Sequence, residues 1–395
     1  MKKSERDEYD KTYGLYKFKR PLPSEIESAM GLVGESILFK KLISADYERF
    51  YDPIKIPEEG DWLMTHKEFG QTYNEYIQND CYQVDPNHNV IYIHRFSSND
   101  DLIKDELFQN VIILLEAFFT GMKVYLYDEG TNYLNNNNEN DNENENNNNE
   151  NNNNENNNNE NNNNNENNGE NNIENNNNIE NNADNNNAIK NGQNEKMAIN
   201  ADQLLEKLKL EMPEDAYCVF GIIDNDLYTE SLSYNGKRLI KSTYCKRSIQ
   251  DRVAIFSLAR FDPFFNFNGK INNLSKEQKY KISLILLKRI CNAITREICY
   301  MFGMKNCIFL SCCMNGTNVT EFDNKQIELC PICLRKLVTN IKANGEDIKT
   351  YRVKKPLIVF NRFVKMRDAL DNFAGIYENE IKWFDARIDF LKGLI

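Results

Sequence analysis

The sequence predicts an α+β fold built on a mixed, mostly parallel sheet. Four runs rich in apolar, β-branched and aromatic residues have the length of strands: 89–96, 123–127, 216–223 and 254–259. A helical pattern lies between the first two runs, which is typical of a right-handed crossover between parallel neighbours. A long helical pattern over 277–302 leads directly into a cysteine-rich segment.

The N-terminal part of the chain is expected to be mostly helical. Residues 1–22 are charged and are expected to form a flexible N-terminus. The segment 23–50 has helical periodicity, with Ser24 as the expected N-cap. Residues 60–77 are expected to form a loop and turn that enter a helix. The crossover helix is expected over 101–119.

The C-terminal part adds two helices to this scheme. A helix is expected at 202–208, whereas the polar segment 228–248 has no clear pattern. Apolar residues near the C-terminus recur at steps of three and four, which predicts one amphipathic helix that closes the core or meets a partner. These residues are Leu370, Phe373, Tyr377, Ile381, Phe384, Ile388 and Leu391.

An Asn/Glu-rich insert, 135–196, interrupts the connection between the second strand and the helix at 202–208. Such a segment has too little apolar surface to offset the entropy of ordering, so we expect it to be disordered. Long inserts in exposed loops cost little free energy, because closure entropy grows only logarithmically with length. The sequence therefore predicts a single domain formed by 23–134 and 197–395.

The charge of the chain resides almost entirely in this insert. It carries thirteen acidic residues and two lysines, which account for −11 of the net charge of −12. A nearly neutral remainder argues against a polybasic nucleic-acid surface. No run reaches the roughly eighteen apolar residues that span a bilayer, so no membrane association is expected.

Cysteine usage bears on the compartment. Five of the ten cysteines lie within 307–333, which is not the pattern of a secreted disulfide framework. The first residues, M-K-K-S-E-R, contain no apolar signal core. A cytoplasmic or nuclear location is expected, and the oligomeric state is open.

Four of these cysteines have the spacing of a metal site. Cys307, Cys312, Cys330 and Cys333 read C-x4-C-x17-C-x2-C, with a proline inside the second pair. Tight turns of this kind place paired thiolates about 2.3 Å from one ion, which predicts a closed, structural zinc site. The plainer alternative is that the cysteines pack in the core. The fifth cysteine, Cys313, is expected to pack beneath the site.

A second pattern overlaps the first. In metzincin peptidases, the motif H-E-x-x-H-x-x-G-x-x-H supplies the ligands of the catalytic zinc ion and is followed by a Met-turn. Glu297, Gly303 and Met314 stand where the general base, the helix-ending glycine and the Met-turn methionine belong. The positions of the three metal-binding histidines are occupied by Arg296, Tyr300 and Asn306.

The run E-x5-G-x3-C-x4-C-x-M-N-G-x-N, with L-C-P-I-C-L-R-K-L after it, resembles the archaemetzincins, a branch of the zinc metallopeptidases. In that family the last histidine directly precedes the first of the four cysteines, and here Asn306 directly precedes Cys307. The resemblance extends to other segments of the chain: G-D-W-L at 60–63, His66, G-Q-T-Y at 70–73, D-L-Y at 226–228 and S-L-A-R-F at 257–261. It implies a metzincin-like fold and aminopeptidase-type cleavage of peptides.

The residues at the former ligand positions are poor ligands for catalytic zinc. Arginine has no lone pair to donate and remains protonated. Asn306 offers a weak amide oxygen, and Tyr300 would have to lose a proton with an ordinary pKa near 10. The three histidines of the chain, His66, His88 and His94, all lie far upstream. We therefore expect one structural zinc ion and no catalytic one.

Without that metal, Glu297 is expected to be an ordinary helix-surface or ion-paired glutamate. The guanidinium of Arg296 is expected to place positive charge in the vacated pocket and to pair with an acidic neighbour. Such a pocket suits a carboxylate or a peptide terminus. His66 is expected to be structural or to form hydrogen bonds.

Two functions remain open on these residues. One is a pseudo-peptidase, a metzincin-like scaffold with one structural zinc that binds a peptide or protein ligand. The other is an active, aminopeptidase-type zinc metallopeptidase that uses rearranged ligands. A weaker third reading, an independent zinc-knuckle interaction module, is disfavoured because Cys307 is fused to the motif through Asn306.

Overall fold

The computed structural model describes residues 18–96, 105–128, 198–233, 235–263, 265, 275–341, 348–373 and 375–395. The chain divides into one unit formed by Met1–Thr131 with Ile189–Ile395 and a second unit, Asn132–Ala188. The second unit lies wholly outside the described residues. The predictions for the insert 135–196, and for most of the N-terminal segment 1–22, therefore stay predictions.

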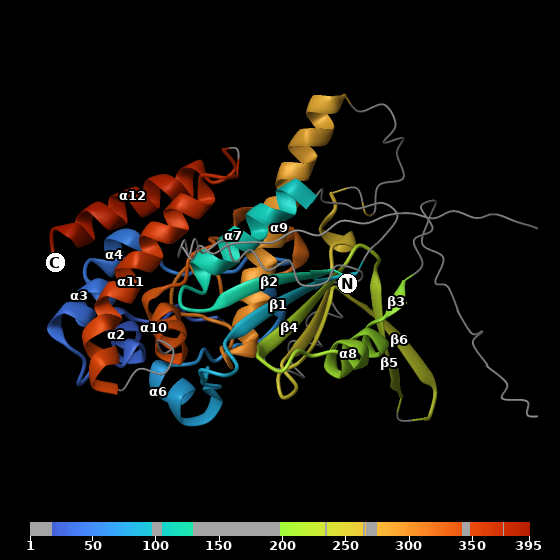
Figure 1. Ribbon diagram of the computed structural model, residues 1–395, viewed down its shortest axis with the longest axis horizontal. Coiled ribbons are helices and arrows are strands. Elements are labelled where there is room, and N and C mark those ends of the chain that lie inside the picture. The colour runs from blue at the N-terminus through green and yellow to red at the C-terminus, as the bar shows by residue number, and fades with distance from the viewer. Residues whose placement is uncertain are drawn as a thin grey trace, which may run out of the picture. The chain divides into compact units, whose positions relative to one another are not determined.

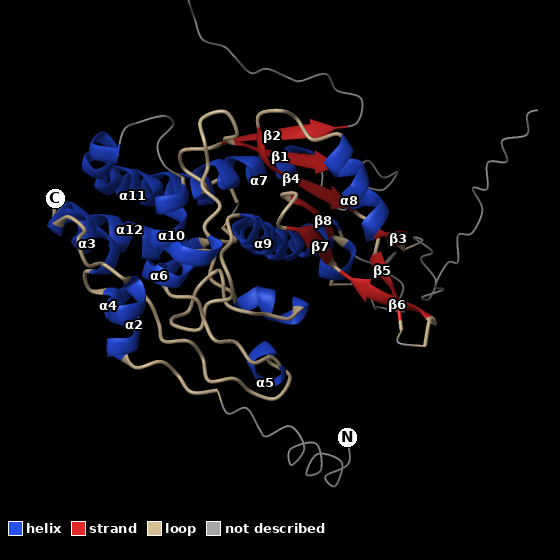
Figure 2. Ribbon diagram, turned by 90° about the horizontal axis from the view of Figure 1, so that it is seen from below, coloured by secondary structure: helices blue, strands red, loops and turns tan. Residues whose placement is uncertain are grey.

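The main sheet has five strands in the order β2-β1-β4-β8-β7 (Figure 2). Their bounds are β1 Val90–Arg95, β2 Lys123–Asp128, β4 Ala216–Ile223, β7 Cys245–Ser248 and β8 Val253–Ser257. The pairs β1–β2, β1–β4 and β4–β8 are parallel, and β7 pairs antiparallel with β8 at one edge. The predicted α+β fold with a mixed, mostly parallel sheet is confirmed.

A second sheet was not predicted. It has three strands in the order β3-β5-β6, with bounds β3 Ile199–Asn200, β5 Leu227–Leu232 and β6 Arg238–Thr243. β6 is exposed along nearly its whole length, and β5 is buried only at its first residue. Because neither strand has a regularly buried face, their sequence lacks the alternation that identifies a strand.

Most of the helices are gathered on one side of the main sheet, and α8 lies on the other side (Figures 1 and 2). Their bounds are α2 Pro23–Met30, α3 Ile37–Ser44, α4 Tyr47–Phe50, α5 Trp62–Thr65, α6 Tyr73–Glu75, α7 Asp105–Phe118, α8 Ala201–Leu210, α9 Lys276–Met301, α10 Pro331–Asn340, α11 Ile348–Leu370 and α12 Glu378–Lys392. The described residues also contain turns of other helix types: η1 Tyr76–Asp80, η2 Ala259–Phe261 and η4 Val319–Asn324. No helix in the described segments is long and apolar enough to cross a membrane.

Two helix predictions were wrong in detail. Leu22, not Ser24, is the N-cap of α2, because Pro23 occupies the first helical position, where its fixed φ suits a helix start. The C-terminal pattern from Leu370 to Leu391 spans two helices and not one. Leu370 ends α11, and the turn before α12 contains Gly375 with φ +82°, a left-handed conformation that interrupts a helix.

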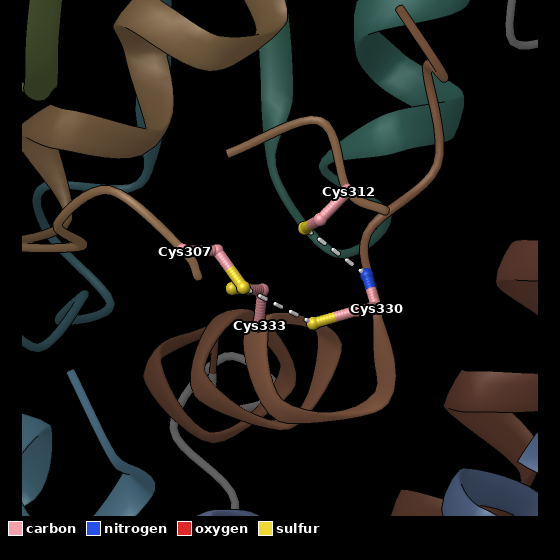
Figure 3. Close-up of side chains that lie close together, drawn as sticks. All are labelled: Cys307, Cys312, Cys330 and Cys333. Atoms are coloured by element: carbon pink, nitrogen blue, oxygen red, sulfur yellow. Dashed lines mark hydrogen bonds between the residues drawn. The ribbon is translucent and has the colours of Figure 1, made fainter. Parts of the chain in front are cut away.

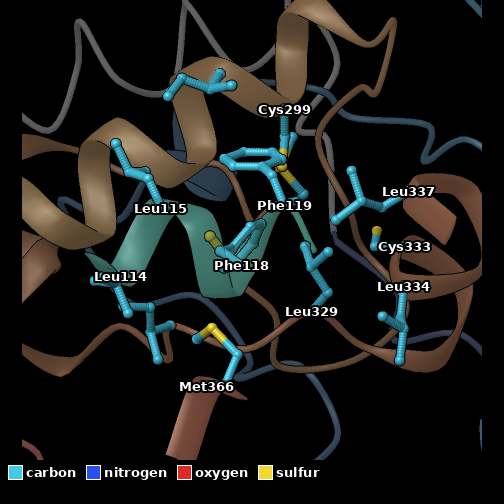
Figure 4. Packing of buried hydrophobic residues seen from close by; sticks show 14 of the residues in the cluster. Leu114, Leu115, Phe118, Phe119, Cys299, Leu329, Cys333, Leu334, Leu337 and Met366 are labelled. Atoms are coloured by element: carbon cyan, nitrogen blue, oxygen red, sulfur yellow. The ribbon is translucent and has the colours of Figure 1, made fainter. Parts of the chain in front are cut away.

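The two faces of the main sheet pack against different helices. On one face, Leu205 and Leu208 of α8 share a cluster with Val219 and Ile255. The other face packs against α7 and α9, and α11 packs on α7 from outside; Phe118, Phe119, Cys299 and Met366 belong to this one large core (Figure 4). In Figure 2, α8 lies across the strands from α7 and α9.

Candidate functional site

The long helix α9 ends in a Schellman motif that sets the geometry of the site. The N–H of Gly303 donates to the carbonyl of Tyr300 at 2.9 Å, and the N–H of Met304 donates to that of Cys299 at 3.3 Å. Gly303 has φ +81°, and a Cβ there would lie 1.6 Å from the carbonyl oxygen of Asp80. Only glycine fits this turn, which brings Asn306 back against the last turns of α9.

The three former ligand positions meet in space. Asn306 Oδ1 accepts a hydrogen bond from Arg296 Nη2 at 3.2 Å and another from the hydroxyl of Tyr300. Asn306 Nδ2 in turn donates to Glu68 Oε1 at 2.6 Å. The side chains that replace the histidines are therefore engaged with one another and with the loop that precedes α6.

Glu297, at the position of the general base, is 1% exposed and paired at both oxygens. Arg296 Nη1 lies 3.3 Å from Oε1. Oε2 accepts from Arg247 Nη1 and, at 3.3 Å, from the thiol of Cys245. Both partners of Oε2 come from the edge strand β7, and the guanidinium of Arg247 stands 4.0 Å over the ring of Tyr300.

Burial and neighbouring charges together determine the protonation states of these groups. Burial raises the pKa of Tyr300, so its phenol stays neutral and acts as a hydrogen-bond donor. Burial alone would lower the pKa of Arg296, but its ion pair with the carboxylate of Glu297 opposes burial, and that pKa is raised above its ordinary value. Burial, assisted by repulsion from Arg296, lowers the pKa of the nearby Lys325 to about 7.

These side chains do not fit a catalytic zinc ion. One ligand position holds a guanidinium, another a neutral phenol, and the third an amide whose oxygen already accepts two hydrogen bonds. A second guanidinium, that of Arg247, bonds the carboxylate of Glu297. A dication at this place would face two fixed positive charges in a buried setting, where repulsion is poorly screened.

The four predicted cysteines do converge (Figure 3). All are buried, and their sulfur atoms lie within 4.8 Å of one another. Cys307 Sγ and Cys330 Sγ are 3.7 Å apart, close to the separation of about 3.8 Å between thiolates in a tetrahedral zinc site. Within the described ranges, no other group of three or more His, Cys, Asp or Glu side chains converges in this way.

Local structure prepares this cluster for a metal ion. Cys330 is the N-cap of α10, Pro331 occupies its first position, and Cys333 lies one turn in. The sulfur of Cys312 accepts from the backbone N–H of Cys330 at 3.2 Å and from that of Met314 at 3.4 Å. The residues therefore fit a structural zinc ion, which would cross-link the turn after α9 to the start of α10.

Cys313 lies outside the four-sulfur group. Its Sγ is 3.5 Å from the hydroxyl oxygen of Thr295 in α9, and its thiol is fully buried. This position agrees with the expectation that it packs beneath the site.

The cluster and the altered motif share one turn. The N–H of Cys307 donates to the carbonyl of Met314 at 2.9 Å, and Asn315 Nδ2 donates to the carbonyl of Cys307 at 2.8 Å. Met314, at the Met-turn position, is fully buried. Lys325 Nζ donates to the carbonyl of Asn315. A metal ion in the cluster would thus also hold Asn306 in place, because Asn306 directly precedes Cys307.

Trp62, the first residue of α5, also reaches the site. Its Nε1 donates to Glu68 Oε1 at 2.8 Å, the same oxygen that accepts from Asn306. Its ring stacks on His66, with centroids 3.4 Å apart. A Cβ at Gly316 would lie 2.3 Å from Trp62 Cδ1, so a side chain there would displace the indole.

The histidines contribute no ligand to the altered motif. His66 is exposed and stacked on Trp62, and His88 pairs with Asp85 on the surface. His94 is buried in β1, stacked on Phe96.

The chain is a zinc metallopeptidase-like protein with a four-cysteine group that fits a structural zinc ion. No protein-family model matches the chain. It is 28% identical over 305 residues to archaemetzincin-2 of Pongo abelii, an alignment that covers 73% of this chain and 69% of that protein. It is 29% identical over 161 residues to archaemetzincin-1 of Homo sapiens, covering 36% and 31%. The chain belongs to the archaemetzincin family.

Among solved structures, the chain is similar to an archaemetzincin from Methanopyrus kandleri. The TM-score is 0.36 at 15% identity, with 65% of this chain and 97% of that chain covered.

Three side chains of the site were missed by sequence reasoning: Cys245, Arg247 and Glu68. The first two lie in β7, inside the polar segment that had no clear pattern. The pair Lys246–Arg247 before a predicted strand was the available signal, but nothing in the sequence indicates an antiparallel edge strand there.

Proposed function

We propose that this protein is a catalytically impaired archaemetzincin, a pseudo-peptidase that keeps one structural zinc ion and binds a peptide or protein ligand without cleaving it. The observation that carries the proposal is the pairing of Glu297 with Arg247 and Arg296. A general base must have an oxygen free for the proton of an attacking water, and both oxygens of Glu297 are engaged by donors.

The missing zinc chemistry supports the same conclusion. A catalytic zinc ion lowers the pKa of its bound water from 15.7 to about 7. Arg296 and Arg247 supply positive charge but no coordination site, so they cannot generate a metal-bound hydroxide. Glu297 alone would be a base without an activated water.

The structural zinc has a different role in this proposal. Cys307, Cys312, Cys330 and Cys333 would hold it, and it would stabilise the fold and not polarise a substrate. The zinc ion would hold the turn after the motif helix against the start of α10. This would keep the site in the shape that binds a ligand.

The alternative is an active zinc peptidase with rearranged ligands. Glu297, Gly303 and Met314 are in register with the motif, which is the observation in its favour. An active peptidase would require that Arg296 and Arg247 break their ion pairs with Glu297. It would also require three other side chains to serve as zinc ligands in place of Arg296, Tyr300 and Asn306.

Elemental analysis and peptide hydrolysis of the full chain test the proposal. We expect one zinc ion per chain. We expect no chelator-sensitive hydrolysis of short peptides. Two tightly held zinc ions, with hydrolysis lost in Glu297→Gln, would overturn it. Glu277→Gln at the exposed start of the same helix is the matched control, since that side chain is 76% exposed.

A further inference from the structure

The side chain of Arg247 is held rigidly at the surface of the site. Its Nη1 bonds the buried carboxylate of Glu297, and its guanidinium lies 4.0 Å from the centre of the Tyr300 ring. Its side chain is nevertheless 32% exposed, against 1% for that of Glu297. Arg247 therefore connects the buried motif with solvent, at the edge strand β7.

One edge of this guanidinium is available. A guanidinium carries five N–H donors in one plane, and Glu297 and Tyr300 engage Nη1 and the face. Within the described residues, the hydrogen bond and the ion pair that join Arg247 to Glu297 both use Nη1, and the remaining edge of the guanidinium is formed by Nε and Nη2. These two atoms form the side-on edge of the guanidinium, which matches the two oxygens of a carboxylate.

The charge around this edge favours an anion. Arg247 and Arg296 carry two positive charges, and they share the single carboxylate of Glu297. Nε of Arg296 is buried and has no hydrogen-bond partner. The carboxylate of Glu68 joins the group through the amide of Asn306. A guanidinium that is already oriented by its existing contacts costs little further ordering when an anion binds.

We propose that the Nε/Nη2 edge of Arg247 binds a carboxylate of a peptide ligand. The carboxylate belongs either to the C-terminus of the peptide or to an Asp or Glu side chain within it. A single guanidinium edge suits a planar, singly charged group better than a phosphate, which usually gathers several donors. The inference rests on the proposed function for the view that the peptide is bound and not cleaved.

Trp62 provides a local reporter of this site. The chain has two tryptophans. Trp62 shares Glu68 with Asn306, which in turn bonds Tyr300 under Arg247. Trp383 lies in α12, where its Nε1 donates to the carbonyl of Phe50 at 2.7 Å. In protein labelled with 5-fluorotryptophan, the ¹⁹F resonance of Trp62 should shift on ligand binding, while that of Trp383 serves as the internal reference.

The test titrates the zinc-loaded full chain with matched synthetic pentapeptides, followed by calorimetry and ¹⁹F NMR. Acetylated penta-alanine with a free C-terminus is compared with its amide. Acetylated, amidated peptides with a central Glu, Gln or phosphoserine form the second set. We expect at least one carboxylate peptide to bind about tenfold or more tightly than its neutral partner. Which pair discriminates identifies the C-terminus or the side chain as the source.

Substitutions at Arg247 test the assignment to this residue. Arg247→Gln should remove the discrimination, and Arg247→Lys should reduce it, because lysine keeps the charge but loses the planar fork. Arg238→Gln on β6, which removes the exposed partner of Glu230, should leave it unchanged. Zinc content and far-ultraviolet circular dichroism establish that each variant is folded. If Arg247→Gln does not fold, Arg247→Lys carries the test.

Three results would overturn the inference: equal binding of carboxylate and neutral peptides, tighter binding of the phosphoserine peptide, or unchanged discrimination in the folded Arg247 variants. These failures are separable from a failure of the proposed function. Cleavage of the peptides with a second bound zinc ion would refute the pseudo-peptidase and leave the carboxylate preference measurable.

Discussion

Arg296 Nη2 donates to Asn306 Oδ1 at 3.2 Å, so two positions that hold metal ligands in the metzincin motif bond each other directly. The hydroxyl of Tyr300 donates to the same oxygen. This hydrogen-bonded group connects α9 to the segment after Gly303, which is the connection that a metal ion would otherwise make. The guanidinium of Arg296 therefore links the two segments in the place where a metal ion would link them.

Removing the Arg296 guanidinium should destabilise the fold. Arg296→Met leaves Glu297 with one cation fewer and Asn306 with one donor fewer, in a buried setting. We expect a loss of about 2–4 kcal/mol in the free energy of unfolding, measured by urea denaturation. Lys281→Met, which removes an exposed pair with Glu277 on the same helix, should change it by less than about 1 kcal/mol. Equal effects of the two substitutions would contradict this role.

Substitutions in the cysteine cluster should separate a zinc ligand, Cys330, from a neighbouring cysteine, Cys313. Cys330→Ser should lower the zinc content and make the C-terminal third sensitive to proteolysis, since an open zinc site loses much of its contribution to folding. Cys313→Ser should keep the full zinc content, because Cys313 lies outside the four-sulfur group. Zinc content is measured by elemental analysis after dialysis. An unchanged content in Cys330→Ser would show that the cluster does not hold the metal.

Rebuilding the catalytic site should require four substitutions. Arg296→His, Tyr300→His and Asn306→His restore the three ligands and should recruit a second zinc ion. Hydrolysis should not follow while Arg247 still holds Glu297. Adding Arg247→Ala frees that carboxylate, so we expect chelator-sensitive peptide cleavage in the quadruple variant alone. Cleavage by the triple variant at a similar rate would show that the Arg247 pair does not restrain Glu297.

The stability of the protein should fall in mild acid because of His94. Its side chain is buried, its Nε2 has no hydrogen-bond partner, and burial lowers its pKa from 6.5 to about 4. Between these two values the unfolded chain binds more protons than the folded one, so stability decreases as the pH falls through this window.

His94→Phe should remove this dependence. From about pH 7 to pH 5, the wild-type protein should lose about 1–2 kcal/mol more of its free energy of unfolding than the variant, with allowance for residual solvent screening. Urea denaturation at the two pH values measures the difference. Parallel losses in both proteins would show that His94 does not titrate in this way.

Much of the fold and part of the site could be predicted from the sequence. Three of the four predicted strands, β1, β4 and β8, are buried on both faces, and such strands leave continuous apolar runs. The four cysteines were identifiable because the spacing of ligands is local in each pair. The long helix and its terminal glycine followed from periodicity and from the residue that a left-handed turn requires.

The partners of Glu297 could not be predicted in the same way. Arg247 approaches from a strand fifty residues upstream, and that strand is polar because it lies at an edge of the sheet. Which cation meets a buried carboxylate depends on the antiparallel register of β7 with β8, and no local pattern specifies that register. The expectation that Arg296 pairs with an acidic neighbour required only adjacency in one helix turn.

The short strand β7 reaches both layers of helices with consecutive residues. Neighbouring side chains of a strand point to opposite faces of the sheet. Lys246 bonds Asp202 at the start of α8, while Arg247 bonds Glu297 in α9. A sideways or twisting displacement of β7 by a ligand at Arg247 would therefore pull on α8 as well. α8 begins directly after β3, so the same displacement would also act on the start of the three-stranded sheet.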